Sequence, residues 1–200
     1  FMASFEAAVE QGVAAVIINS PNNPSGAILS EQTLRVMSKI LQVAQEEQGK
    51  SIYLIADEPY RELVYGDVQV PFVPSFYDNT IVCYSYSKSL SLPGERIGYV
   101  LVSPAMDGWE KVYAAICGAG RALGYICAPA LFQHMLPACA GITADLSVYA
   151  ENRALLYGAL TEMGFSCVPP DGAFYLFVKS PEPDAKAFSE RAKKYELLLV

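Results

Sequence analysis

Residues 85–98 read SYSKSLSLPGERIG and follow directly on an apolar run, residues 80–84, that has the length of a β-strand. Lys88 lies among small hydroxyl side chains, and Arg96 follows eight residues later, just before a second apolar run. An amine, hydroxyls and a guanidinium gathered beyond a strand suit a phosphorylated aldehyde, because the amine can form an imine while the other groups bind the phosphate. Taken alone, the segment fits a solvated loop with a surface lysine equally well.

The sequence around this segment alternates short apolar runs with longer amphipathic runs. The apolar runs predict strands at residues 14–18, 52–56, 80–84 and 97–102, and an amphipathic run predicts a helix at 5–11. A second helix is predicted between Ser30, which offers an N-cap, and Gly49, where a helix should end. Nearly continuous apolar strands separated by helices indicate the α/β class, with a mostly parallel sheet and helices on both faces.

The pattern changes after about residue 140. Residues 145–163 predict one long helix, two strands follow at 165–168 and 173–178, and a helix at 184–195 leads to a last strand at 197–200. The turn between the two middle strands reads PPDG. We therefore expect two units, an incomplete α/β unit from residue 1 to 143 and part of an α+β unit from 144 to 200.

Composition and charge exclude several classes of partner. Apolar residues make up 52% and charged residues 18%, a balance typical of globular rather than disordered chains. The net charge is −7 and no block of Lys or Arg occurs, which argues against nucleic acid and anionic membranes. The most apolar stretch, residues 112–132, contains Arg121, three glycines and a proline, so we interpret it as buried protein rather than a membrane span.

Cysteine and histidine usage argues against a metal site. The five cysteines are widely spaced without a C-x-x-C pair, and His134 is the single histidine. We therefore predict no bound metal, and we interpret the cysteines as buried, reduced thiols of a cytoplasmic protein.

Two further polar segments also follow predicted strands. Residues 19–26 read NSPNNPSG, a rigid turn that would hold the Asn23 amide against a ligand, although such residues also form plain turns. Residues 56–60 read ADEPY, in which Asp57 would face a buried ligand cation and Tyr60 the same pocket. Asp57 also suits the N-cap of a short helix. In doubly wound sheets, ligands bind beyond the carboxyl ends of strands, which is where all three segments begin.

Together, and in this order, the three segments resemble the fold type I pyridoxal-phosphate enzymes of aminotransferase class I and II, the aspartate aminotransferase type. The family pattern is an N-P-x-N-P-[TS]-G turn, then D-x-x-Y, then S-x-S-K with an arginine eight residues on. One change occurs here, since Ser20 stands where proline is common. Residues 172–175, GAFY, also resemble the family's small-domain strand near the substrate, so the resemblance covers the whole chain.

The resemblance implies catalytic roles for Lys88, Asp57 and Tyr60. Lys88 would carry pyridoxal 5'-phosphate as a Schiff base and, once released, shuttle a proton between the substrate and the cofactor. Asp57 would pair with the protonated pyridine nitrogen, so that the ring can accept electrons. Tyr60 and Asn23 would hydrogen-bond the ring hydroxyl.

The resemblance also implies a phosphate site and missing parts. Ser85 and Arg96 would bind the phosphate, and Ser87 would assist. The family's N-terminal phosphate loop and ring-stacking aromatic residue would precede Phe1, and its carboxylate-binding arginine would follow Val200. We therefore expect a fragment of a longer protein that is inactive alone.

The implied function of the full-length protein is transfer of an amino group from an L-amino acid to a 2-oxo acid, by a cytoplasmic homodimer. Two alternatives remain: a C–S β-lyase of the same fold, and an aminotransferase-like sensor domain of a transcription regulator. Arg121 matches the region where dicarboxylate-specific relatives bind the substrate side chain, and it also suits an ordinary ion pair. The sequence leaves the substrates open.

Overall fold

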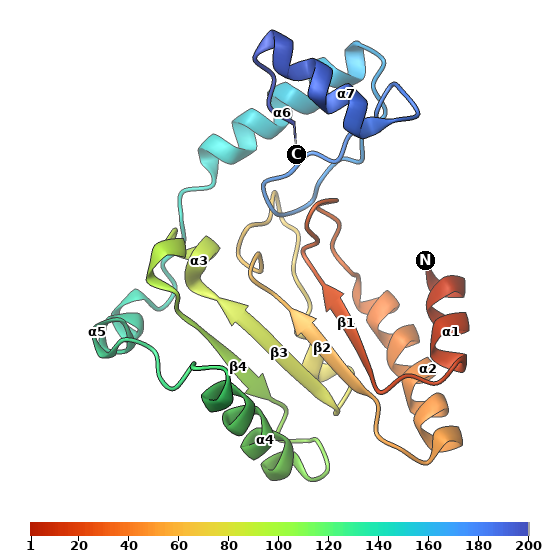
Figure 1. Ribbon diagram of the computed structural model, residues 1–200, viewed down its shortest axis with the longest axis vertical. Helices are drawn as coiled ribbons and strands as arrows, with labels where there is room; N and C mark the ends of the chain where they lie inside the picture. The colour runs from red at the N-terminus through yellow and green to blue at the C-terminus, as the bar shows by residue number, and fades with distance from the viewer. Residues whose placement is uncertain (200) are drawn as a thin grey trace.

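The computed structural model describes residues 1–199 and contains a four-stranded sheet with the strand order β1-β2-β3-β4 (Figure 1). The strands are β1 (Ala15–Asn19), β2 (Tyr53–Asp57), β3 (Thr80–Ser85) and β4 (Gly98–Val102). β1, β2 and β3 run parallel, whereas β4 pairs antiparallel with β3. The predicted α/β class and mostly parallel sheet are confirmed, and the carboxyl ends of three strands meet at one edge.

Two helices cover one face of this sheet. α1 (Met2–Glu10) packs beside α2 (Glu31–Gln48), which runs along the strands (Figure 1). Ser30 caps α2 by accepting a hydrogen bond from the Thr33 amide, and Gly49 ends it in the left-handed conformation. Both ends of α2 therefore lie where the sequence predicts them.

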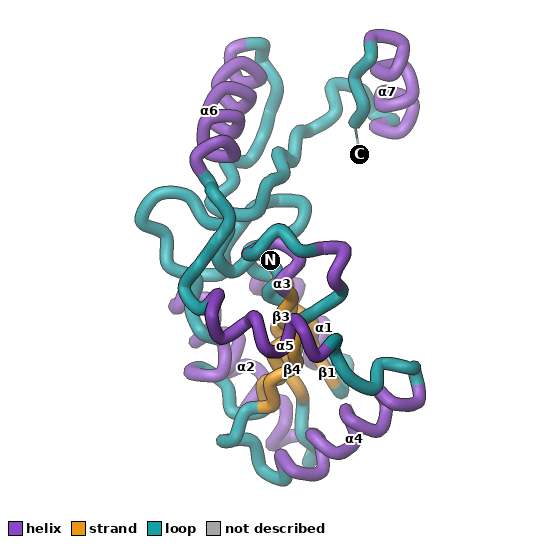
Figure 2. The backbone as a smooth tube through the Cα atoms, turned by 90° about the vertical axis from the view of Figure 1, so that its left-hand side faces the viewer, coloured by secondary structure: helices purple, strands orange, loops and turns teal. Residues whose placement is uncertain are grey.

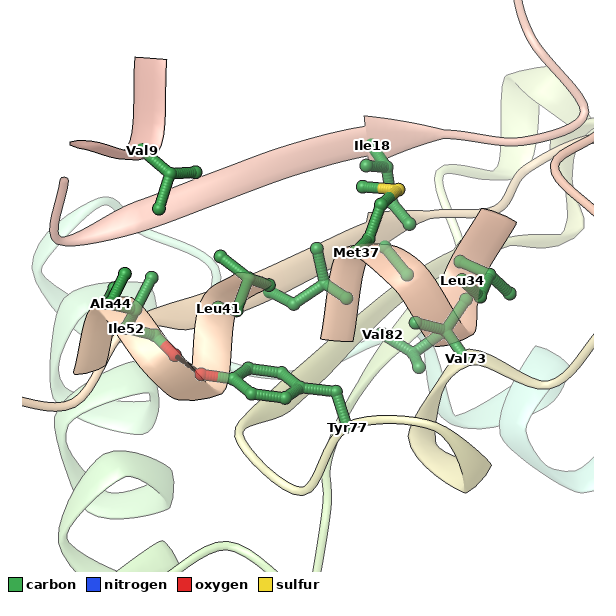
Figure 3. Close-up of a cluster of buried hydrophobic side chains, with 12 residues drawn as sticks. Val9, Ile18, Leu34, Met37, Leu41, Ala44, Ile52, Val73, Tyr77 and Val82 are labelled. Atoms are coloured by element: carbon green, nitrogen blue, oxygen red, sulfur yellow. Dashed lines mark hydrogen bonds between the residues drawn. The ribbon is translucent and has the colours of Figure 1, made fainter. Parts of the chain in front are cut away.

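The main apolar core lies between α2 and the sheet. Every second residue of β2 and β3 is buried, as expected for strands with one face covered. At the far end of the strands, the Tyr77 hydroxyl donates to the Ile52 carbonyl at 2.8 Å, so this buried phenol is satisfied (Figure 3). The buried members of the core are Val9, Ile18, Leu34, Met37, Leu41, Ala44, Ile52, Leu54, Ala56, Val73, Tyr77 and Val82.

Helices also lie on the opposite face of the sheet, as predicted, but they cover it only partly. Ile17 of β1 points to that face and is 71% exposed. α4 (Trp109–Ala122) lies beside β4, and α5 (Ala130–Met135) follows it, yet neither contains a buried residue. The expectation that residues 112–132 are buried is therefore wrong within this chain, because no other described segment packs over them. Among residues 1–199, no helix has the length and apolar composition needed to cross a bilayer.

The last third of the chain forms a separate region at the opposite end from α4 (Figures 1 and 2). It contains α6 (Ser147–Glu162) and α7 (Ala185–Ala192), both predicted. The strands predicted at 165–168 and 173–178 are wrong, since only an isolated bridge joins Cys167 and Val178. No strand is present at residues 197–199, and Val200 lies outside the described residues. Short 3₁₀ helices lie at Val73–Ser75, Pro93–Glu95, Leu136–Cys139 and Lys193–Tyr195.

The backbone of residues 171–173 pairs with the sheet region instead of forming a hairpin. The amides of Asp171 and Gly172 both donate to the Gly26 carbonyl at 3.0 Å, and the Ala173 amide donates to the Leu63 carbonyl at 2.8 Å. A Cβ on Gly172 would come within 2.9 Å of the same Leu63 oxygen. These contacts bring residues 174–175 to the carboxyl edge of the sheet.

Candidate functional site

The side chains that follow β1, β2 and β3 gather at the carboxyl edge of the sheet. Asn19 is the register partner of Asp57, and Ser85 ends the next strand. The strand tips point toward the region of α6 and α7 (Figure 1). Because three parallel strands end at this edge, residues far apart in the sequence are brought within reach of one ligand.

Asp57 is held by a residue to which the sequence assigned no role. The Asn19 amide nitrogen donates to an Asp57 carboxylate oxygen at 3.1 Å and to the Asp57 carbonyl at 2.9 Å. Its side-chain oxygen accepts from the Asn23 backbone amide at 2.7 Å, so one side chain ties the carboxylate to the turn. The position of Asn19 at a strand end, immediately before the turn, is the signal that would have identified it.

The electrostatic environment of Asp57 disfavours its charge. Burial raises the pKa of the Asp57 carboxyl above its usual range, and the hydrogen bond from Asn19 offsets part of that rise. Within residues 1–199, no basic side chain forms an ion pair with this carboxylate. A cationic group bound against Asp57 would therefore relieve a desolvated charge.

Asn23 and Tyr60 lie together, as the resemblance implies. The Asn23 side-chain amide donates to the Tyr60 hydroxyl at 3.3 Å. Tyr60 is buried in a small cluster with Leu63 and Ala173, so its ring is fixed while its hydroxyl lies beside the turn. Both groups can bind a single ligand oxygen.

Lys88 lies in the one-turn helix α3 (Tyr86–Ser89) directly after β3. Its amine lies 5.2 Å from the centroid of the Phe174 ring and 5.9 Å from that of Tyr60. In the described part of the chain it forms no ion pair or hydrogen bond. The amine is therefore partly enclosed by aromatic faces and has no acidic partner to neutralise it.

Ser85, Ser87 and Arg96 line one cavity of about 180 Å³, together with Ile97 and Gly98. The Ser85 and Ser87 hydroxyls lie 2.6 Å apart. The guanidinium of Arg96 donates to the Pro93 carbonyl at 2.7 Å, which uses one of its five N–H groups. The cavity thus presents hydroxyls and a guanidinium, a set of donors suited to a phosphate.

The antiparallel pairing of β3 and β4 explains why Arg96 lies close to Ser85 and Ser87. Ser85 is the register partner of Gly98, and the Tyr86 amide donates to the Ile97 carbonyl at 3.1 Å. A Cβ at Gly98 would clash with the Tyr84 carbonyl oxygen, so the close approach requires glycine. Lys88 and Arg96 therefore both lie in the connection, residues 86–97, that joins these two paired strands.

Phe174 and Tyr175 contribute to the site from the second region. The ring of Phe174 meets Tyr60 edge-on at 5.6 Å, and the Tyr175 hydroxyl lies 3.2 Å from the Tyr60 hydroxyl. Both residues also line a cavity of about 270 Å³ beside α6, which Arg153 borders. Arg121, by contrast, is exposed in the last turn of α4 and makes no ion pair with the described residues.

A buried acid lies next to Asp57 along the chain. Glu58 is 2% exposed and pairs with Arg61 at 2.7 Å, while its second oxygen has no hydrogen-bond partner among the described residues. Burial raises the pKa of the Glu58 carboxyl, and the Arg61 guanidinium opposes that rise. Within residues 1–199, no cluster of His, Cys, Asp or Glu has the arrangement of a metal site.

Comparison with known proteins agrees with this geometry. The model of aminotransferase class I and II matches residues 2–199. The aspartate aminotransferase of Thermotoga maritima is 32% identical over 183 residues, covering 88% of this chain and 44% of the relative. Aromatic-amino-acid aminotransferase 2 of Thermococcus litoralis is 30% identical over 188 residues, covering 88% of this chain and 45% of the relative.

Solved structures share the fold over nearly the whole chain. The crystal structure of an amino transferase from Eubacterium rectale has a TM-score of 0.93 at 56% identity, and the match covers 97% of this chain and 50% of that one. The chain spans about half the length of the curated relatives it matches. From the family match and these similarities, the chain belongs to the aminotransferase class I and II family.

Proposed function

We propose that the protein transfers an amino group from an L-amino acid to a 2-oxo acid with pyridoxal 5'-phosphate as cofactor. The observation that carries this proposal is the amine of Lys88, which has no acidic partner and lies beside Tyr60 at the edge that also presents Asp57. Family membership supports the reaction class. Relatives named for aspartate and for aromatic amino acids leave the substrate open.

The residues present fit this cofactor in their chemistry. A carboxylate with a raised pKa suits a pyridinium partner, and the hydroxyl and guanidinium cavity suits a phosphate. Bound pyridoxal phosphate would supply an aldehyde and a ring that accepts the electrons of a breaking C–H bond. Ser85, Ser87 and Arg96 would hold its phosphate.

The remaining roles follow from the positions of the side chains. The Lys88 amine would act first as the nucleophile and, once free, would take the proton from the substrate α-carbon. Asp57 would keep the ring nitrogen protonated. Asn23 and Tyr60 would donate hydrogen bonds to the ring oxygen, and Asn19 would fix the Asp57 carboxylate and the Asn23 turn together.

The proposal extends to the organisation of the protein. Residues 1–143 would form part of the large cofactor-binding domain and residues 144–200 part of the small domain. We also propose a cytoplasmic homodimer. The five cysteines are free, which fits a reducing compartment, but two are exposed and three are half-buried, so the expectation that they are buried is wrong.

A product analysis of the full-length protein tests this function. The protein is incubated with the cofactor, a panel of nitrogen-labelled L-amino acids and a 2-oxo acid, and labelled product amino acids are identified by mass spectrometry. We expect label in a new amino acid, lost in Lys88→Ala and retained in Lys111→Ala, a matched exposed lysine of α4. Pyruvate and ammonia without a new amino acid would instead indicate a C–S lyase, and cofactor binding without turnover would indicate a sensor.

A further inference from the structure

The Tyr60 hydroxyl has two neighbours, one from each region of the chain. Asn23 donates to it at 3.3 Å, and the Tyr175 hydroxyl lies 3.2 Å away, 115 residues further along the sequence. The two tyrosine rings meet edge-on with centroids 6.0 Å apart. Tyr175 itself has no assigned role in cofactor binding.

Tyr175 is fixed in place by the chain that follows Tyr60. The Ala173 amide donates to the Leu63 carbonyl at 2.8 Å, and the Tyr65 hydroxyl donates to the Ala173 carbonyl at 2.6 Å. Ala173 is fully buried and adopts a positive φ of 58°, a conformation that an alanine keeps only where its surroundings impose it. The constrained backbone at Ala173 therefore holds the phenol of Tyr175 next to Tyr60.

A phenol has a single proton, so the direction of each hydrogen bond matters. Asn23 already donates to the Tyr60 oxygen. If Tyr60 gives its proton to a ligand oxygen, then the bond with Tyr175 persists only when Tyr175 is the donor. A hydroxyl that accepts a hydrogen bond becomes a stronger donor, because chains of hydrogen bonds polarise one another.

We propose that Tyr175 is a positioning residue, whose hydroxyl donates to Tyr60 and so directs the Tyr60 proton toward the ring oxygen of the cofactor. This inference rests on the proposed function. Its consequence is that Tyr175 lowers the basicity of the nitrogen that links Lys88 to the cofactor. A residue of the second region would thereby adjust the basicity of a nitrogen that belongs to the sheet region.

The charges around Tyr60 are consistent with a role as a proton donor. Burial raises the pKa of Tyr60 to about 12, and the hydrogen bond from Asn23 opposes the rise. Tyr175 adds to the rise, as it does when Tyr60 is the donor of their shared bond, so the proposed direction requires a ligand oxygen that takes the Tyr60 proton. The groups that face Tyr60 are the amine of Lys88 on α3, the carboxylate of Asp57 on β2, and the Tyr175 phenol. Tyr60 therefore keeps its proton well above neutral pH.

The test is a pH titration of the visible absorption of the cofactor-loaded protein, as its gene encodes it. Tyr175→Phe should raise the midpoint pH of the absorption change by roughly half a unit, the size expected for one neutral hydrogen bond. Tyr60→Phe should raise it further, and adding Tyr175→Phe to Tyr60→Phe should change nothing more. Tyr195→Phe is the matched control, because it removes an exposed hydroxyl of the second region that is bonded to neither Tyr60 nor Tyr175.

The outcomes separate the two proposals. An unchanged midpoint in Tyr175→Phe, or an equal shift in the Tyr60→Phe background, would overturn the role of Tyr175 while leaving the function intact. Absence of any Lys88-dependent absorption in the unsubstituted protein would instead overturn the proposed function. The contact has its own readout in the cofactor-free protein. The NMR resonance of the Tyr60 phenol carbon should move in Tyr175→Phe and stay in Tyr195→Phe, and an unmoved resonance in Tyr175→Phe would refute the contact.

Discussion

The two regions that meet at Tyr60 are stabilised in different ways. The sheet region places Asp57 and Ser85 through strand register and buries a continuous core beneath them. The α6–α7 region buries little of its own surface, and α6 contains no buried residue. It contacts the site through residues 170–175, which are held by a few hydrogen bonds to Gly26 and Leu63. The sheet side of the site is therefore fixed by strand register, while the Phe174–Tyr175 side depends on local contacts.

A matched pair of leucines gives the largest expected difference between the regions. Leu41 of α2 is 0% exposed, whereas Leu155 of α6 is 70% exposed. Leu41→Ala should lower the free energy of unfolding by about 2–5 kcal/mol, because it leaves a cavity in the core. Leu155→Ala should change it by no more than about 0.5 kcal/mol. Urea denaturation of both variants measures the difference, and equal losses would contradict the contrast.

Glycine substitution tests the junction between the regions. A Cβ at Gly26, where φ is +70°, would clash with Pro170, whereas Gly12, at φ +86°, has nothing within 4 Å of its added Cβ. Both positions share the cost of a positive φ, so their difference isolates the clash. Gly26→Ala should cost about 1–3 kcal/mol more than Gly12→Ala by denaturation. If the junction does not contribute to stability, Gly26→Ala and Gly12→Ala should lose the same free energy of unfolding.

The sequence predicted the sheet region better than the second region, for physical reasons. Strands 15–19 and 53–57 and the Ser30 cap follow from local patterns that the fold preserves. The proximity of Asn23 and Tyr60 follows instead from the family resemblance. The strands at 165–168 and 173–178 were wrong, because the backbone of Ala173 bonds to Leu63 rather than to its neighbours in sequence. The Tyr60–Tyr175 contact joins residues 115 positions apart, and no local pattern reveals it.

The smallest expected effect concerns pH. Because burial raises the pKa values of Asp57 and Glu58 in the folded chain, the native state binds protons more tightly than the unfolded state. Their contribution to stability is therefore full below the unfolded values of roughly 4 and is lost as the pH rises through the folded values. Asp57→Asn should make the cofactor-free chain slightly more stable at neutral pH and flatten this dependence, as measured by denaturation across pH.

Controls sharpen the interpretation of that result. Asp67→Asn, at an exposed position, serves as the matched substitution. With cofactor bound, Asp57→Asn should instead be less stable than the unsubstituted protein. The Asp57 carboxylate would then face a cation, and its loss would weaken cofactor binding. A gain in stability for Asp57→Asn that persists with cofactor would argue against a pyridinium partner at this carboxylate.

Reductive trapping shows whether Lys88 is the residue that binds pyridoxal phosphate covalently, as we propose. The protein is mixed with the cofactor, reduced with borohydride and digested, and the modified peptide is identified by mass spectrometry. We predict a single modified lysine, Lys88, within the peptide that contains Ser85, and no modification in Lys88→Ala. Modification spread over exposed lysines, or unchanged in Lys88→Ala, would contradict the assignment of this site.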